Sequence, residues 1–295
     1  MEKIRIHSDC LSCLAVKETE KYPEGISEAV KLEYKKGVLS ILGNAKPSDS
    51  APLLVKYISD LQQKMFGKGF DYTEAKIYFN DYVMKKAAGI EEDIFNAEDA
   101  VFRALQYAMT GNYIDFGTPS NVNEEKFDEL VENAKNLQLD AVTYENLKKD
   151  LYTAKKLVVL TDNCGEIVFD KIMIKILKTF YPSLEITAIV RGLPALNDAT
   201  MEDAKQIGLT ELVNVIGNGT DIAGTVYDRI SKEAQTALKE ADVVISKGLG
   251  NFETLNGCGL NVYYLFMCKC KMFAEKFHKN LFEGILINDK SVMEN

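Results

Sequence analysis

The chain contains 295 residues, of which 46% are hydrophobic and 27% are charged. This is the composition of a folded protein, and it excludes intrinsic disorder, collagen-like repeats and coiled-coil arrays. The 35 lysine and arginine residues are outnumbered by 44 aspartate and glutamate residues, which gives a formal net charge of -9. Because nonspecific nucleic-acid binding requires a dense cationic surface, we expect no nucleic-acid partner.

Targeting signals and cysteine content narrow the class of protein further. No window of the sequence approaches 18 consecutive apolar residues, so we expect no membrane-spanning helix and no membrane partner. The N-terminal segment MEKIRIHSDC lacks the apolar core of a signal peptide, which predicts a cytoplasmic protein. Six cysteines are too few for a disulfide scaffold in a chain of this length, and a reducing compartment would keep them as thiols.

The first half of the chain has the pattern of a helical region. Apolar residues recur at helical spacing from about residue 27 to residue 149. The segments 51–65, 73–88 and 97–109 each place their apolar residues on one face of a helix. We therefore predict a helical N-terminal region over residues 1–150.

Short apolar runs alternate with helical patterns in the second half. The runs lie at residues 157–160, 186–190, 213–216, 243–245 and 285–287, and helical patterns lie at 167–180 and at about 199–207. This alternation is typical of βαβ units and predicts a mostly parallel sheet with helices on both faces.

These patterns together predict an α/β fold. A Rossmann-like, mostly parallel sheet over residues 151–295 would form the metal- and phosphate-binding domain, with the helical region packed on it. Residues 145–155 contain no proline or glycine that would mark a flexible linker. We therefore expect the two parts to share an interface.

Polar segments follow three of the predicted strands. They read TDNCGE at 161–166, RGLPALNDAT at 191–200 and SKGLGNFE at 246–253. Ligands of open α/β sheets bind beyond the carboxyl ends of the strands, so we expect these segments to meet at one edge of the sheet.

The chemistry of these segments is complementary. Asp162, Asn163 and Asp198 offer oxygen ligands that suit Mg²⁺, Mn²⁺ or a similar divalent ion. Lys247, beside two glycines, suits a phosphate oxygen, and a metal and a lysine together stabilise charge on a phosphoryl group. Each aspartate or asparagine also fits the alternative of a helix N-cap, and the paired glycines fit a tight turn. There is no Walker A loop and no G-x-G-x-x-G, which disfavours nucleotide cofactors.

Four sequence blocks carry a resemblance to a known family. They are GNYIDFG at 111–117, DNCGE at 162–166, VRGLPALNDAT at 190–200 and KGLGNFE at 247–253. In this order and spacing they resemble the DUF89 family, the damage-control phosphatases related to the protein once called acidic residue methyltransferase 1. The resemblance covers nearly the whole chain. It implies a metal-dependent phosphatase that hydrolyses phosphate monoesters of small, in some cases damaged, metabolites such as sugar phosphates.

The same resemblance implies roles for individual residues. Asp162, Asn163 and Asp198 would hold a divalent metal (Mg²⁺, Mn²⁺, Co²⁺ or Ni²⁺), and Lys247 would bind the phosphate. Asp162, Asp198 and Lys247 would be catalytic, and either an activated water or an aspartate, with Asp162 as the candidate, would attack phosphorus. The candidates for substrate binding are Asn112 and Asp115 from the helical side, Glu166, Arg191, Gly248, Gly250 and Asn251. Leu249 stands where the family motif has glutamine, which affects substrate specificity.

The cysteines indicate one branch of this family. Cys10-x-x-Cys13 and Cys270 resemble the microbial subfamily that carries a CxxC motif and a late cysteine. Thiolates of Cys10, Cys13 and either Cys268 or Cys270 would form a second metal site, for Zn²⁺. The alternative is a set of buried or redox-sensitive thiols.

Two other functions fit parts of the sequence. A Rossmann-like core also hosts S-adenosylmethionine-dependent methyl transfer, but the first loop has one glycine and the second strand ends in Val190 and Arg191 without an acidic residue. The cysteines also fit a metal- or redox-responsive binding module without turnover. The complete set of oxygen ligands together with Lys247 favours the enzyme, and the sequence leaves the oligomeric state open.

Overall fold

The computed structural model describes residues 5–67, 71–114 and 123–293. Within these residues six strands form one sheet: β1 (Lys156–Leu160), β2 (Glu185–Val190), β3 (Asn214–Gly217), β4 (Val243–Lys247), β5 (Val262–Met267) and β6 (Gly284–Asn288). The strand order is β3-β2-β1-β4-β5-β6, and only the β5–β6 pair is antiparallel. This is the strand order of a Rossmann-like sheet, and the predicted α/β fold with a mostly parallel sheet is confirmed.

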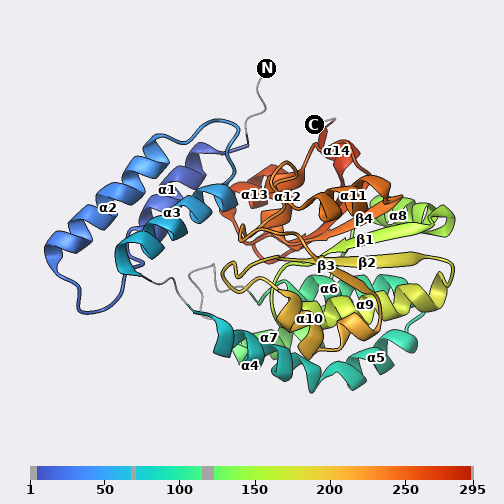
Figure 1. Cartoon of the computed structure of the whole chain (residues 1–295). Helices are drawn as coiled ribbons and strands as arrows, with labels where there is room; N and C mark the ends of the chain where they lie inside the picture. Colours follow the sequence, from blue (N-terminus) through green and yellow to red (C-terminus); the bar gives the residue numbers. More distant parts are fainter. Residues whose placement is uncertain (1–4, 68–70, 115–122, 294–295) are drawn as a thin grey trace.

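The helices divide into those before the sheet and those within it. Before β1 lie α1 (Ser8–Glu18), α2 (Glu28–Gly43), α3 (Ala51–Phe66), α4 (Thr73–Met84), α5 (Ala87–Phe95), α6 (Ala100–Gly111), α7 (Glu124–Glu132), the short η1 (Ala134–Asn136) and α8 (Ala141–Thr153). After β1 come α9 (Glu166–Phe180), α10 (Met201–Gln206), η2 (Leu209–Glu211), α11 (Lys232–Glu240), α12 (Leu249–Leu255), α13 (Lys271–Phe277) and α14 (Asp289–Met293). Helices α6, α9 and α10 cover one face of the sheet, and α11, α12 and α13 cover the other (Figure 1).

Local chemistry explains where two of these helices begin and end. The Asp99 side chain accepts a hydrogen bond from Phe102 N (3.0 Å), so α6 begins at Ala100, three residues after the predicted start. The predicted helix over 73–88 is divided into α4 and α5 by a turn in which Lys86 N donates to Val83 O (2.9 Å).

The strand β5 has no counterpart among the predicted strands. Its six residues, VYYLFM, are all buried. A strand buried on both faces lacks the alternation of apolar and polar residues that marks a half-exposed strand, and its apolar run cannot be told from a buried helix by periodicity alone. The five strands that were predicted correspond to β1, β2, β3, β4 and β6.

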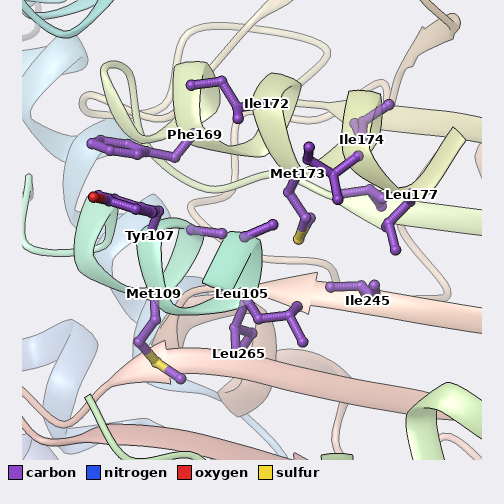
Figure 2. Close-up of a cluster of buried hydrophobic side chains, with 14 of the residues drawn as sticks. Leu105, Tyr107, Met109, Phe169, Ile172, Met173, Ile174, Leu177, Ile245 and Leu265 are labelled. Atoms are coloured by element: carbon purple, nitrogen blue, oxygen red, sulfur yellow. The ribbon is translucent and has the colours of Figure 1, made fainter. Parts of the chain in front are cut away.

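The main hydrophobic core joins the two halves of the chain. Figure 2 shows Leu105 of α6, Met173 of α9, Ile245 of β4 and Leu265 of β5 gathered in one buried cluster. At the end of this layer the rings of Tyr107 and Phe169 lie nearly parallel, with centroids 6.4 Å apart. The predicted boundary at residue 150 falls within α8, and this core contains residues from both sides of it.

Helices α1, α2 and α3 form a separate unit to one side of the sheet (Figure 1). Their core includes Tyr34, Val38 and Ile58, all fully buried. Polar contacts join this unit to the loop between β3 and α11: the Lys56 ammonium lies 3.0 Å from Asp221, and an Arg229 guanidinium N–H donates to the Tyr57 hydroxyl (2.9 Å). None of the helices in the described ranges combines the length and apolar character that a membrane span requires.

The packing of α6 on α9 and the sheet predicts where the fold is sensitive to mutation. Leu105→Ala removes a fully buried side chain and should lower the free energy of unfolding by about 2–5 kcal/mol. Leu39→Ala on α2 is the matched control: Leu39 is 53% exposed, and its loss should change stability by about 0.5 kcal/mol or less. Urea denaturation of both variants measures the difference, and equal midpoints would contradict the assigned core.

Candidate active site

The candidate site lies where the strand order reverses. From β1 the chain moves to β2 on one side and later to β4 on the other, so the loops after these strands diverge around a crevice at their carboxyl ends. The three polar segments predicted from the sequence begin there, after Leu160, Val190 and Ile245. The structure therefore brings distant segments of the chain into hydrogen-bonding range: Asn251 Nδ2 donates to Thr161 O (3.0 Å), 90 residues earlier in the chain.

Backbone hydrogen bonds hold the first two loops against each other. Ala199 N donates to Asp162 O (2.7 Å), and Arg191 N donates to Ala199 O (2.8 Å). Asn163 and Asp198 face each other as an isolated antiparallel β-bridge. The main chain therefore fixes Asp162, Asn163 and Asp198 at one place, independently of their side-chain contacts.

The Asn163 side chain is oriented by two carboxylates. Its Nδ2 donates to Asp162 Oδ2 (2.7 Å) and to Glu166 Oε2 (3.0 Å). Because the amide nitrogen faces these acceptors, the amide oxygen Oδ1 points the other way. Asn163 is buried, with an exposed fraction of 3%, so this orientation is well constrained.

A buried arginine lies between the two aspartates. Arg191 Nε donates to Asp198 Oδ2 (2.6 Å), and its Nη2 lies 3.6 Å from Asp162 Oδ1. Arg191 Nη1 donates to Thr225 Oγ1 (3.4 Å). Among the described residues Nη2 has no hydrogen-bond acceptor, although the side chain is almost fully buried. One N–H edge of a guanidinium is therefore directed at the site.

The electrostatics of the site favour a cation. Burial, and then the nearby carboxylates of Asp198 and Glu166, raise the pKa of Asp162 well above its usual range, while Arg191 acts in the opposite direction. Two carboxylates and one amide oxygen match the hard oxygen ligands that Mg²⁺ and Mn²⁺ prefer. In the described ranges no group of three or more histidine, cysteine, aspartate and glutamate side chains is placed to hold a metal ion, so a site here depends on the Asn163 amide. The residues fit a divalent ion.

Glycines permit the close approach of the third loop. Gly248 has φ +80°, and a Cβ built on it would lie 2.0 Å from Asp162 Oδ2. A Cβ on Gly250 would lie 2.3 Å from Ala223 O. Asn251 ties this loop to the end of β1, because its Nδ2 donates to Thr161 O (3.0 Å). Gly248 therefore lets the loop approach Asp162 closely, and Gly250 lets it approach the Ala223 backbone.

Asn112 reaches the site from the helical half, at the end of α6. Its Nδ2 donates to Glu166 Oε2 (2.9 Å) and to Asp162 Oδ2 (3.1 Å), and its Oδ1 accepts a hydrogen bond from Met267 N (3.0 Å). The structure therefore brings the predicted residue Asn112 to the carboxylates. The other residue predicted from this side, Asp115, lies outside the described residues.

Lys247 lies beneath the site and is fully buried. Its Nζ donates to Asp170 Oδ1 (2.6 Å), Glu166 Oε1 (2.7 Å) and Ala108 O (2.9 Å). An ammonium has three N–H groups, so in this arrangement none is left for a phosphate. The predicted phosphate contact would require Lys247 to leave two buried carboxylates.

The sequence interpretation missed Asp170 and Thr225. Asp170 lies four residues after Glu166 inside an otherwise apolar helical run, and this spacing places both carboxyl groups on one face of α9. An acidic residue on the apolar face of a helix was the signal that could have identified it. Thr225 contacts Arg191 and also donates to Asn251 Oδ1 (2.8 Å), but it lies in a loop without a pattern of its own.

The cysteines do not form a metal-binding group in the part of the chain that the structure describes, which includes Cys10, Cys13 and Cys270. Burial and the neighbouring Glu253 carboxylate raise the pKa of Cys10 to about 11. Burial therefore disfavours the thiolate, the reactive form of cysteine, at this position. The predicted second metal site is not supported.

Carboxylate and amide oxygens thus gather at the switch point of the sheet, the place where the strand order reverses. A site of this class suits divalent ions and anionic substrates. Comparison with known proteins identifies the family. Residues 6–284 match the damage-control phosphatase ARMT1-like domain, and the chain belongs to this family. The predicted resemblance to the damage-control phosphatases is confirmed at this level.

Individual relatives agree with this assignment. A damage-control phosphatase from Archaeoglobus fulgidus is 31% identical over 214 residues, which are 71% of this chain and 73% of that protein. A damage-control phosphatase from Pyrococcus horikoshii is 28% identical over 277 residues, covering 92% of this chain and 94% of the relative. The crystal structure of a DUF89 family protein from Pyrococcus horikoshii superposes with a TM-score of 0.81 at 25% identity and covers 96% of this chain and 99% of that one.

The contact between Gly248 and Asp162 predicts the effect of adding one methyl group. Gly248→Ala should displace the Asp162 carboxylate and weaken Mn²⁺ binding by about 10-fold or more, since disturbing even an outer partner of a metal site costs about 10–100-fold. Gly259→Ala is the matched control, because Gly259 has the same φ of +80° but nothing within 4 Å of an added Cβ. Titration calorimetry compares the two, and equal Mn²⁺ affinities would contradict this geometry.

Asp170 predicts a pH dependence of stability. Burial raises its pKa to about 7, against the opposing effect of Lys247, whereas an unfolded aspartate has a pKa of about 3.9. Between about pH 4 and about pH 7 the folded state therefore holds a proton that the unfolded state has released, and the free energy of unfolding falls as the pH rises. Asp170→Asn should flatten this slope, while Asp228→Asn at an exposed position should leave it unchanged. Urea denaturation between pH 4 and pH 8 tests this, and parallel curves for wild type and Asp170→Asn would refute it.

Proposed function

We propose that this protein is a divalent-metal-dependent phosphatase that hydrolyses phosphate monoesters of small, in some cases damaged, metabolites such as sugar phosphates. The observation that carries the proposal is the convergence of the Asp162 and Asp198 carboxylates with the Asn163 amide at the switch point of the sheet. The names of the relatives from Archaeoglobus fulgidus and Pyrococcus horikoshii support phosphatase chemistry. Sequence membership of the damage-control phosphatase ARMT1-like family supports the substrate class.

The residues of the site would have different roles in phosphoryl transfer. Asp162, Asn163 and Asp198 would hold the divalent ion, which when bound supplies positive charge to phosphoryl oxygens. Arg191 orients Asp198 through their 2.6 Å hydrogen bond, and its Nη2 would donate to a phosphoryl oxygen. The amides that follow Gly248 add further donors, since the first N–H groups of a helix lack an acceptor within it. These groups together stabilise negative charge as it develops on the phosphoryl group.

We also assign the chain to the family branch with the CxxC motif. The support is the motif itself at the start of α1 and the late Cys270 at the start of α13. Cys10 lies close enough to Cys13 and Cys270 for the three to interact electrostatically. The effect of Cys13 and Cys270 on the pKa of Cys10 supports grouping the CxxC motif with the late cysteine.

The function is tested with chelator-stripped protein, p-nitrophenyl phosphate and a panel of sugar phosphates. Adding Mg²⁺, Mn²⁺, Co²⁺ or Ni²⁺ singly should restore phosphate release with at least one ion. Asp198→Ala should lower this release by about 100-fold or more, because the loss of even an outer partner of a metal site costs about 10–100-fold. Circular dichroism confirms folding of the variant.

Glu185→Ala removes an exposed carboxylate at the amino end of β2, the opposite end of the strand from the site; it serves as the matched control and should keep wild-type activity. Full metal-restored activity in Asp198→Ala would remove this residue from the site. Release of phosphate that persists without any divalent ion would show that metal dependence is wrong.

A further inference from the structure

Three charged side chains are enclosed beneath the candidate site. Lys247, Glu166 and Asp170 all have an exposed fraction of 0%. Lys247 is the last residue of β4, and the two carboxylates lie one turn apart on α9. Charges this deeply buried are tolerated when they are paired and hydrogen-bonded, so each member of the cluster depends on the others.

Lys247 is the cation that balances both carboxylates. Burial by itself lowers the pKa of Lys247, but Asp170 and Glu166 outweigh burial and the net pKa lies above the usual range. Among the described residues Asp170 Oδ2 has no hydrogen-bond partner, so Lys247 supplies the hydrogen bond to that carboxylate through Oδ1. The third N–H donates to the Ala108 carbonyl of α6. The ammonium is therefore saturated by protein groups.

Glu166 connects this cluster to the oxygen ligands above it. Its Oε1 accepts from Lys247, while its Oε2 accepts from the amides of Asn163 (3.0 Å) and Asn112 (2.9 Å). The Asn163 amide in turn donates to Asp162. A chain of hydrogen bonds therefore runs from Lys247 through one carboxylate to two of the residues that would hold the metal.

We propose that Lys247 is a positioning residue for the metal site, acting through Glu166 on the Asn163 amide, and that it does not bind the phosphate of the substrate. This inference rests on the proposed function, because it assumes that Asp162, Asn163 and Asp198 hold the ion. Without the ammonium, Glu166 Oε1 keeps only the 3.2 Å hydrogen bond from Asn112 Nδ2, so the carboxylate is held less firmly toward Asn163. The Asn163 oxygen then loses the orientation that the carboxylates impose on it.

The experiment measures metal affinity and phosphate affinity separately in the full-length protein. Titration calorimetry with Mn²⁺ compares wild type, Lys247→Met and Asp170→Asn. Lys247→Met should weaken Mn²⁺ binding by about 10–100-fold, the usual cost of losing a group that orients a metal ligand. Asp170→Asn is the matched control, because it changes the same cluster at the same depth and leaves the Lys247–Glu166 pair intact. Its Mn²⁺ affinity should stay within about threefold of wild type, a smaller effect than the loss of an orienting partner.

Phosphate affinity separates positioning from direct binding. At saturating Mn²⁺, inhibition of p-nitrophenyl phosphate hydrolysis by inorganic phosphate should have the same inhibition constant in wild type and Lys247→Met. A constant raised about 10-fold or more, with Mn²⁺ affinity unchanged, would show that Lys247 contacts phosphate and would overturn the inference. A variant that is only less stable, with both affinities unchanged, would show a purely structural role and would overturn it as well.

A second variant covers the case in which Lys247→Met does not fold. Lys247→Met/Asp170→Leu removes opposite charges together, and replacement of a buried pair by apolar groups is often tolerated. It should lose Mn²⁺ affinity to the same degree, and wild-type affinity in this variant would refute the inference. A wild-type protein that binds no Mn²⁺ would instead overturn the proposed function and this inference with it, so the two failures are distinguishable.

Discussion

The hydrogen bonding of one buried carboxylate, that of Glu166, is the interaction on which the geometry of the site depends. Its two oxygens accept hydrogen bonds from Lys247 on one side and from Asn112 and Asn163 on the other. A carboxylate without access to water is stable only when such partners are in place. The need to satisfy Glu166 therefore fixes, at the same time, strand β4, the end of α6 and the loop after β1. A change in any one of these elements would therefore shift the side chains that offer oxygen ligands.

The packing of α6 on α9 explains why the helical half contributes to the site. Leu105 and Tyr107 anchor α6 in the same core as α9 and the central strands. That placement brings the Ala108 carbonyl to Lys247 and carries Asn112 to the carboxylates. A helix that precedes the sheet in the chain thus completes a site whose remaining groups follow the strands. Hydrophobic packing supplies the rigidity that closely spaced charged groups require.

The fold could be predicted from the sequence where one signal dominated. Apolar runs followed by polar turns gave most strands and the parallel sheet, because each strand is flanked by a helical pattern. The pattern failed for β5, because all of its residues are buried and it shows no alternation of apolar and polar residues. It also extended the helix that begins at Thr73 to residue 88, past the end of α4 at Met84, since the periodicity continues across the turn at Lys85 and Lys86. Burial on both faces and helix ends depend on neighbouring elements, which the local pattern does not contain.

The sequence by itself determined the family, the α/β class and the polar segments that carry Asp162, Asn163, Asp198 and Arg191, because residue type and position after a strand suffice for these. The direction in which each side chain points was decided only by the tertiary structure. Lys247 ends an apolar strand and precedes a glycine, a context that indicates a phosphate ligand. Its side chain instead points to the face of the sheet covered by α6 and α9, where it contacts two carboxylates. Alternate residues of a strand point to opposite faces, so the register of β4 and the packing of α9 settle that direction.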